Sequence, residues 1–133
     1  MSSTSPNLKL SLIATSQNNK ETVANSEIVG LDEAMCGNQT FALADADFTV
    51  PQSDALASIF LKFTRVLTAN RHIILPSGSA KMWIVLNATT STGSIDPFTL
   101  IFEVGTDSVV AAISDGNAHL IYSDGVGTVK VCS

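Results

Sequence analysis

Residues 81–87 read KMWIVLN, the clearest of several short β-rich runs that fill the later part of the chain. Met82, Ile84 and Leu86 alternate with Trp83, which is the period of two that a β-strand imposes on its two faces. Both faces of this run are apolar, although an antiparallel sheet commonly keeps one face in water. We therefore expect the second face to be covered by another subunit.

Seven further runs have a similar character and are separated by turn residues, mainly Gly, Pro, Asp and Asn. They are residues 40–43, 59–65, 72–75, 98–104, 109–113, 120–123 and 128–131. Short strands that recur about every 8–12 residues are typical of an antiparallel β-sandwich or a jelly roll. The predicted fold is therefore mainly β, an antiparallel β-sandwich or jelly-roll-like domain with an extended N-terminal arm and one N-terminal helix.

The arm is predicted over residues 1–20. Leu8, Leu10 and Leu12 alternate with polar residues, as in an extended segment. An extended peptide can add a strand to the edge of a neighbouring sheet, so this arm is a candidate docking element. It lacks the basic start and the long apolar core of a secretory signal peptide. We therefore expect the protein to be made in a bacterial cytoplasm.

The helix is predicted over residues 21–37. Ala24, Ile28, Leu31 and Met35 follow the 4-3-4 spacing of one helical face. Acidic residues are expected on the outer side of the helix, namely Glu27, Asp32 and Glu33. The rest of the chain, residues 38–133, is expected to form the β body of one domain overall, with a loop and one short helical turn within residues 45–58.

The composition limits the possible functions. The chain has 133 residues, the size of one domain, and a net charge of -5. Seven scattered Lys and Arg residues make no basic patch, so we expect no binding to nucleic acid. No window of 18 apolar residues predicts a membrane span. Charged residues make up only 14%, against a typical ~25%, which indicates surface that is buried between subunits.

The residue types that carry catalysis or bind metals form no recognisable constellation. His72 and His119 each lie in a β run without a nucleophile or metal ligand beside them. Cys36 and Cys132 have the spacing of no metal motif and are expected to be reduced thiols, with a bridge between them as the alternative. The acidic loop at residues 45–54 lacks an EF-hand register. We expect no enzyme activity, no cofactor and no metal.

Two parts of the chain resemble modules of phage structural proteins. The first comprises PNLKL at residues 6–10, SQNNKE at 16–21, NSE at 25–27 and LD at 31–32. It resembles a "Leu-x-Leu … Ser-Gln-x-x-Lys-x-Val … Asn-Glu … Leu-Asp" signature of tail-fibre-like and head-spike proteins from phages, prophages and gene-transfer particles. The chain departs from this signature at Ser26, which separates the Asn from the Glu.

The second part comprises LTANRHIILP at residues 67–76, KMWIVLNATT at 81–90 and LIYSDG at 120–125. It is similar to a β-rich module of phage structural proteins with the form "Leu-Thr-Ala-Asn-Arg … Leu-Pro … Asn-Ala-Thr … Tyr-x-Asp-Gly". Together the two resemblances cover residues 6–125. They imply a component of the virion and carry over no catalytic residue.

We therefore expect a non-enzymatic phage structural protein, most favourably a homotrimeric capsid decoration (cement) protein that binds the major capsid protein or another virion protein. The alternatives are a tail-fibre, baseplate or head-spike adaptor of the virion and, less favoured, a carbohydrate-binding module whose glycan stacks on Trp83 and Tyr122. The candidate interface residues are Leu8, Leu10, Leu12, Ile28, Leu31, Trp83 and Tyr122.

Overall fold

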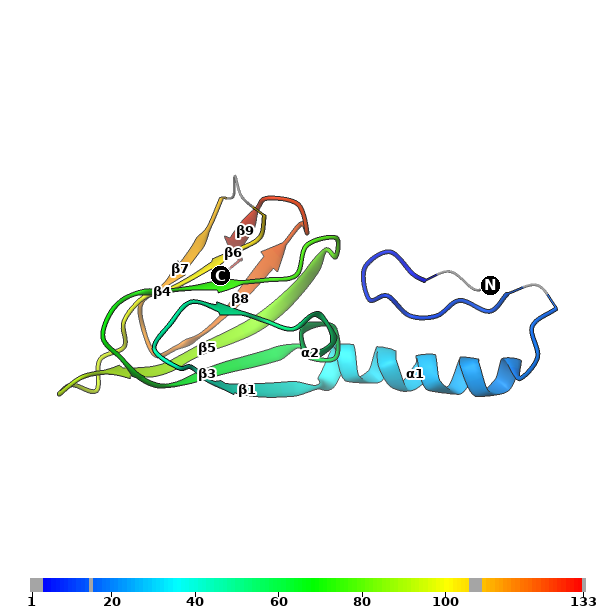
Figure 1. Cartoon of the computed structure of the whole chain (residues 1–133), viewed down its shortest axis with the longest axis horizontal. Helices are drawn as coiled ribbons and strands as arrows, with labels where there is room; N and C mark the ends of the chain where they lie inside the picture. Colours follow the sequence, from blue (N-terminus) through cyan, green and yellow to red (C-terminus); the bar gives the residue numbers. More distant parts are fainter. Residues whose placement is uncertain (1–3, 15, 106–108, 133) are drawn as a thin grey trace.

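A computed structural model describes residues 4–14, 16–105 and 109–132 (Figure 1). Two β-sheets form a body at one end of the molecule, and helix α1 (Lys20–Cys36) extends away from this body. The N-terminal segment lies beside α1, and a second, short helix α2 (Gln52–Leu56) lies where α1 meets the body. The prediction of a mainly β protein with one main helix is confirmed.

Nine strands make up the two sheets. They are β1 (Asn38–Ala42), β2 (Phe48–Thr49), β3 (Phe60–Leu67), β4 (Arg71–Ile74), β5 (Lys81–Ser91), β6 (Leu100–Glu103), β7 (Ala111–Ile113), β8 (Ala118–Ser123) and β9 (Val129–Val131). The five-stranded sheet has the order β1-β3-β5-β8-β9, and the four-stranded sheet has the order β2-β4-β6-β7. Each predicted run overlaps one of these strands, whereas β2 has no predicted counterpart.

The chain crosses between the two sheets after each of the first five strands. Strands β1, β3 and β5 pair in parallel in one sheet, and β2, β4 and β6 pair in parallel in the other. Each pair β1–β2, β3–β4 and β5–β6 therefore forms one rung of a path like that of a β-helix. Strands β7, β8 and β9 pair antiparallel with their neighbours.

The predicted antiparallel arrangement is therefore wrong for the first six strands, because both sheets are mixed. Turn residues mark where a strand ends, and they do so equally well for a hairpin and for a crossing to the opposite sheet. The side chains that decide between these connections lie on neighbouring rungs, more than twenty residues away along the chain.

Aromatic side chains stack along the rungs inside the body. Phe41 and Phe63 occupy the same position on β1 and β3, and their ring centroids lie 5.5 Å apart. Phe102 reaches the Phe63 ring edge-on from the opposite sheet, also with a centroid distance of 5.5 Å. All three side chains belong to one buried cluster that includes residues of both sheets. The two sheets therefore share a single hydrophobic core, which drives their association.

Polar side chains at one corner tie each rung to the next. The Asp47 carboxylate accepts a hydrogen bond from the backbone N–H of His72 at 2.9 Å, and Asn70 accepts one from Thr99 N–H at 2.9 Å. In both cases the donor occupies the equivalent position one rung further along. Asn70, part of the Thr-Ala-Asn-Arg motif, therefore stabilises the stacking of rungs by pairing a backbone donor.

The same corner also holds an ion pair. Asp45 accepts hydrogen bonds from the backbone N–H and the hydroxyl of Thr68, and from Arg71 at 2.9 Å. These contacts, the Thr68 N–H first among them, hold the pKa of Asp45 below its usual value. The acidic loop thus supplies hydrogen-bond acceptors to the next rung.

The N-terminal segment is not the extended arm that the leucine alternation predicts. Residues 6–8 form a turn, Ser5 N–H donates to the Leu10 carbonyl at 2.8 Å, and the chain doubles back. Asn7 then accepts a hydrogen bond from Ala80 N–H at 2.7 Å, and Lys9 Nζ donates to the Gly78 carbonyl at 2.9 Å. Polar contacts with the loop before β5 therefore fold the segment onto the body. Residues 1–3 and 15 of the predicted arm lie outside the described residues.

Candidate interaction surface

The predicted interface residues fall into different environments. Trp83 lies in the core with 0% of its surface exposed, and its indole N–H donates to the Ala55 carbonyl at 2.8 Å. It is therefore a core residue, and its assignment to an interface is wrong. Tyr122 is 39% exposed and pairs across the strands with Met82, whereas Trp83 pairs with Ile121. Because side chains alternate along a strand, Trp83 and Tyr122 point to opposite faces and form no shared sugar-stacking platform.

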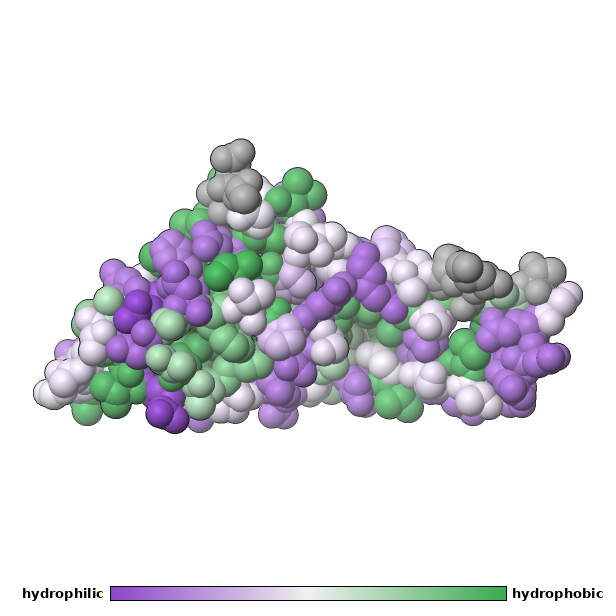
Figure 2. Space-filling view, in the orientation of Figure 1, coloured by the Kyte–Doolittle hydropathy of each residue, from purple (hydrophilic) through white to green (hydrophobic). Residues whose placement is uncertain are grey.

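Helix α1 carries an apolar stripe that its own chain does not cover. We call Ala24, Ile28, Leu31 and Met35 the helix stripe. Ile28 is 65% exposed, Leu31 is 44% exposed and Met35 is 64% exposed. The predicted helix is confirmed, since α1 runs over Lys20–Cys36. Figure 2 shows hydrophobic side chains at the surface near α1 as well as over the β body.

The N-terminal segment contacts a different side of α1 from the one that carries the helix stripe. Glu27 accepts hydrogen bonds from Ser11 N–H at 2.8 Å and from the Ser26 hydroxyl at 3.2 Å, and Ala34 is buried. Gly30 lies so close to Leu10 that an added Cβ would come within 2.9 Å of its Cδ2 atom. The expectation that Glu27 lies on the outer side of the helix is therefore wrong. The N-terminal segment offers Glu27 a backbone donor on this side of α1, while Ile28, Leu31 and Met35 stay exposed.

A glycine inside the helix is the one local signal of this contact. Glycine in a helix interior costs about 0.5–1 kcal/mol relative to alanine, so its presence indicates that another chain segment approaches closely. Gly30 has this position, between Val29 and Leu31. A glycine at this position could therefore have predicted the contact from the sequence.

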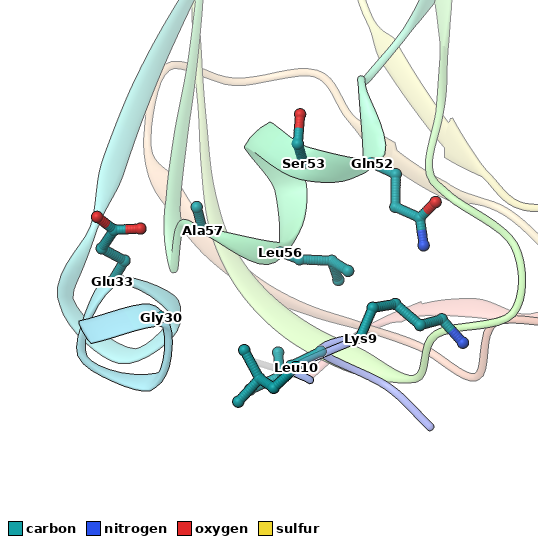
Figure 3. Close-up of a pocket in the computed structure, with 9 residues that line it drawn as sticks. Lys9, Leu10, Gly30, Glu33, Gln52, Ser53, Leu56 and Ala57 are labelled. Atoms are coloured by element: carbon teal, nitrogen blue, oxygen red, sulfur yellow. The ribbon is translucent and has the colours of Figure 1, made fainter. Parts of the chain in front are cut away.

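A cavity of about 410 Å³ lies where the N-terminal segment, α1 and α2 meet (Figure 3). Its lining residues are Leu8, Lys9, Leu10, Gly30, Glu33, Gln52, Ser53, Leu56 and Ala57. The predicted interface residues Leu8 and Leu10 therefore face this cavity and are partly covered within the chain. Leu12, by contrast, is 46% exposed and remains available to a partner.

The outer face of the five-stranded sheet carries a second apolar surface. We call Met82, Ile84, Leu120 and Tyr122 the sheet patch. Met82 lies opposite Tyr122, and Ile84 lies opposite Leu120, on the antiparallel pair β5–β8. The intervening β5 residues, Trp83 and Val85, are fully buried. Strand β5 is therefore apolar on its inner and its outer face, as its sequence indicates, and the outer face has no cover within the described part of the chain.

The titratable groups lie in separate places. His72 Nδ1 is 3.2 Å from Glu103 Oε1 on the four-stranded sheet, and His119 Nε2 is 2.8 Å from Asp115 Oδ1 beside the five-stranded sheet. The His119 hydrogen bond lowers the pKa of Asp115. Cys36 and Cys132 are both free and exposed. Within residues 4–14, 16–105 and 109–132, no three His, Cys, Asp or Glu side chains gather to hold a metal ion.

Among the lysines in the described part of the chain, Lys81 has a shifted pKa. Its ammonium group donates to the carbonyls of Ser58 and Met82 and lies 5.0 Å from the centre of the Trp83 ring. Burial lowers the pKa of Lys81 to about 8, from the ordinary 10.5. These contacts hold the start of β5 against the loop that follows α2.

The lowered pKa of Lys81 predicts that the stability of the fold changes with pH in the alkaline range. Between about pH 8 and pH 10.5 the unfolded chain binds more protons at Lys81 than the folded chain, so the free energy of unfolding is expected to rise with pH. After allowance for solvent screening, the expected rise is about 1 kcal/mol. Urea unfolding of wild type and Lys81→Met at several pH values measures it. Lys81→Met should lack this part of the rise, whereas Lys62→Met should retain it.

No helix in the described residues is long and apolar enough to span a membrane. No protein-family model matches the chain, and neither a curated protein nor a solved structure matches it.

Proposed function

We propose that this chain is a non-enzymatic structural protein of a phage particle, most favourably a capsid decoration (cement) protein. The observation that carries the proposal is the helix stripe, which stands outside the β body and is exposed along α1. Large exposed apolar side chains add nothing to the core of the folded chain, and contiguous ones mark interaction surfaces. The two resemblances to phage structural modules supply the kind of assembly in which this surface is used.

In this proposal the α1 end of the molecule contacts the assembled shell, whose major capsid protein is the partner. The two sheets stack as a sandwich-like body that remains outside the shell. A protein that binds the assembled shell and not its free subunits stabilises the shell by mass action. The gain is about 2.7 kcal/mol per site when the free protein is at a hundred times its Kd. The site of action is the virion, and synthesis takes place in the host bacterial cytoplasm.

The test uses phage heads that lack this protein, prepared from a deletion strain of the phage that encodes it. We expect the added full-length chain to co-sediment with these heads and to raise the temperature at which they release DNA. The double variant Ile28→Asp/Leu31→Asp should lose both effects. Ile95→Asp is the matched control, because Ile95 is 89% exposed in the loop between β5 and β6, away from α1. Failure of the wild-type chain to bind or protect the heads contradicts the cement function.

The second candidate is an adaptor of a tail fibre, baseplate or head spike. It is favoured by the elongated outline of the molecule, which has a helix at one end and a β body at the other (Figure 1). Electron microscopy of virions that carry gold-labelled protein separates the two candidates. Label on the head surface supports decoration, whereas label confined to the tail supports the adaptor. The carbohydrate-binding alternative loses its supporting observation, since Trp83 is buried and Tyr122 points the other way.

A further inference from the structure

We infer that strand β1 pairs antiparallel with β1 of a second copy of this chain, so that two five-stranded sheets join edge to edge. Strand β1 is the first strand of its sheet and pairs with one neighbour, β3. It lies along the border of the body, with no further element of the described chain beside its free edge (Figure 1). A free edge presents a row of unpaired backbone groups, which is a template for another strand.

The hydrogen bonds between β1 and β3 show which backbone groups the edge offers. The Gly37 carbonyl accepts from Ile59 N–H at 2.8 Å, and Leu43 N–H donates to the Thr64 carbonyl at 3.1 Å. Successive residues of a strand turn their backbone groups to opposite sides, so the odd-numbered residues of β1 face β3. The exposed, even-numbered residues therefore offer their N–H and C=O groups to a partner: Asn38, Thr40 and Ala42.

The other sheet edges carry devices that block pairing, whereas β1 carries none. Strand β2 has two residues and is soon followed by Pro51, and β9 has three residues with Lys130 in the middle. The β7 and β9 edges are also tied together, because Val109 exchanges backbone hydrogen bonds with Gly127 and Val129. Short strands, proline, lysine and covering segments all protect an edge. Strand β1 has five residues, no charge, no proline and a continuous register with β3.

The β1 edge is complementary to itself. In an antiparallel pair centred on Thr40, this residue lies opposite the partner's Thr40, and Asn38 lies opposite the partner's Ala42, with about six backbone hydrogen bonds. Two threonines are favourable cross-strand neighbours, and β1 brings no charge against its copy. Because the contact is twofold, it uses the free edge of both chains and leaves only protected edges. Association therefore ends at two copies.

The pair also joins the two cores and keeps the two helices apart. Phe41 and Phe48 are the aromatic side chains of the first rung, with ring centroids 5.1 Å apart, and Phe48 is only partly buried. A twofold axis through Thr40, perpendicular to the sheet, keeps the inner faces on one side, so a second copy continues the core from these rings. Helix α1 continues the line of β1 away from the body, so the helices of the pair point in opposite directions (Figure 1).

The mass in solution tests the pairing. Strand addition gains its affinity from main-chain hydrogen bonds, so light scattering of the full-length wild type should rise with concentration to twice the 13.9 kDa of one chain. Thr40→Pro removes an N–H that β3 does not use, so it should stay folded by circular dichroism and raise the dissociation constant at least about tenfold. Thr40→Val keeps this N–H and should remain dimeric. A wild type that stays monomeric up to millimolar concentration, or forms the trimer expected from the sequence, overturns the inference.

Engineered cysteines test the register without the proline variant. In a Cys36→Ser/Cys132→Ser background, Thr40→Cys places two thiols on opposed residues whose Cα atoms lie about 5.5 Å apart, a distance that a disulfide spans. Ala42→Cys is the matched control, because it lies on the same exposed face but is about 13 Å from its copy along the strands. On oxidation, Thr40→Cys should form a linked dimer and Ala42→Cys should not. Absence of the first link, or equal linking of both variants, contradicts the antiparallel register.

The pairing and the proposed function use different surfaces, so they fail independently. Ile28→Asp/Leu31→Asp should remain dimeric while it loses the binding to phage heads, and Thr40→Pro should bind the heads as a monomer. A wild-type dimer that binds no heads overturns only the proposed function. A monomeric wild type that protects the heads overturns only the pairing.

Discussion

Trp83→Ala is expected to lower the free energy of unfolding by about 4 kcal/mol. Trp83 is the largest fully buried side chain, and its replacement leaves a cavity in the core that both sheets share. It also removes the indole donor from the Ala55 carbonyl, which fastens α2 to β5. Domains of this size are stable by only about 5–15 kcal/mol, so much of the variant should be unfolded in moderate urea. Far-UV circular dichroism during urea titration measures the loss.

Two control variants separate burial from the loss of an aromatic ring. Tyr122→Ala removes a ring from the outer face of the same strand pair, and we expect it to cost less than about 1 kcal/mol in a monomer. Trp83→Phe keeps most of the volume but leaves the Ala55 carbonyl without its donor, so an intermediate cost of about 1–3 kcal/mol is expected. Equal costs for Trp83→Ala and Tyr122→Ala would show that the two faces of the β5–β8 pair are not buried differently.

Asn87→Ala is expected to destabilise the fold by about 3 kcal/mol, although the residue is neither large nor charged. Asn87 is 1% exposed, and its amide group donates to the carbonyls of Phe98 at 2.7 Å and Ile113 at 3.1 Å. Its own carbonyl accepts hydrogen bonds from the N–H and the hydroxyl of Thr89. Alanine would leave these buried groups without partners. Urea unfolding measures the cost, and hydrogen exchange should quicken at β6 and β7.

The replacement by leucine distinguishes hydrogen bonding from packing. Asn87→Leu restores the volume but still leaves the Phe98 and Ile113 carbonyls unpaired, so it should remain destabilised by more than about 1 kcal/mol. Asn117→Ala, at an exposed turn, is the matched control and should change stability little. If Asn87→Leu were as stable as wild type, the hydrogen bonds of Asn87 would not hold the two sheets together.

Asn87 also marks the place where the repeated path ends. It occupies the position that Phe41 and Phe63 hold on the two preceding rungs. There the aromatic stack is replaced by an amide that joins β5, the segment before β6, and β7. Strand β6 still pairs in parallel with β4, but β7, β8 and β9 after it pair antiparallel. Its place in the Asn-Ala-Thr motif therefore has a structural explanation.

Several features of the fold could be predicted because they depend on nearby residues. The alternation in residues 81–87 predicts β5, and the 4-3-4 spacing of the stripe predicts α1. The apolar character of both faces of β5 also follows from its alternation, and it leads to the sheet patch. The folded-back N-terminal segment could not be predicted, because Asn7 and Lys9 bind to residues about seventy positions away.

The sequence by itself determined where α1 and all strands except β2 lie, where turns interrupt them and how little charge the chain carries. These properties follow from side-chain periodicity and composition, which act over a few residues. Only the tertiary structure decided that the first six strands alternate between two sheets, that Trp83 is covered, and that α1 turns Glu27 inward and its stripe outward. Each of these depends on contacts between distant segments, whose free energies compete with the local preferences and here outweigh them.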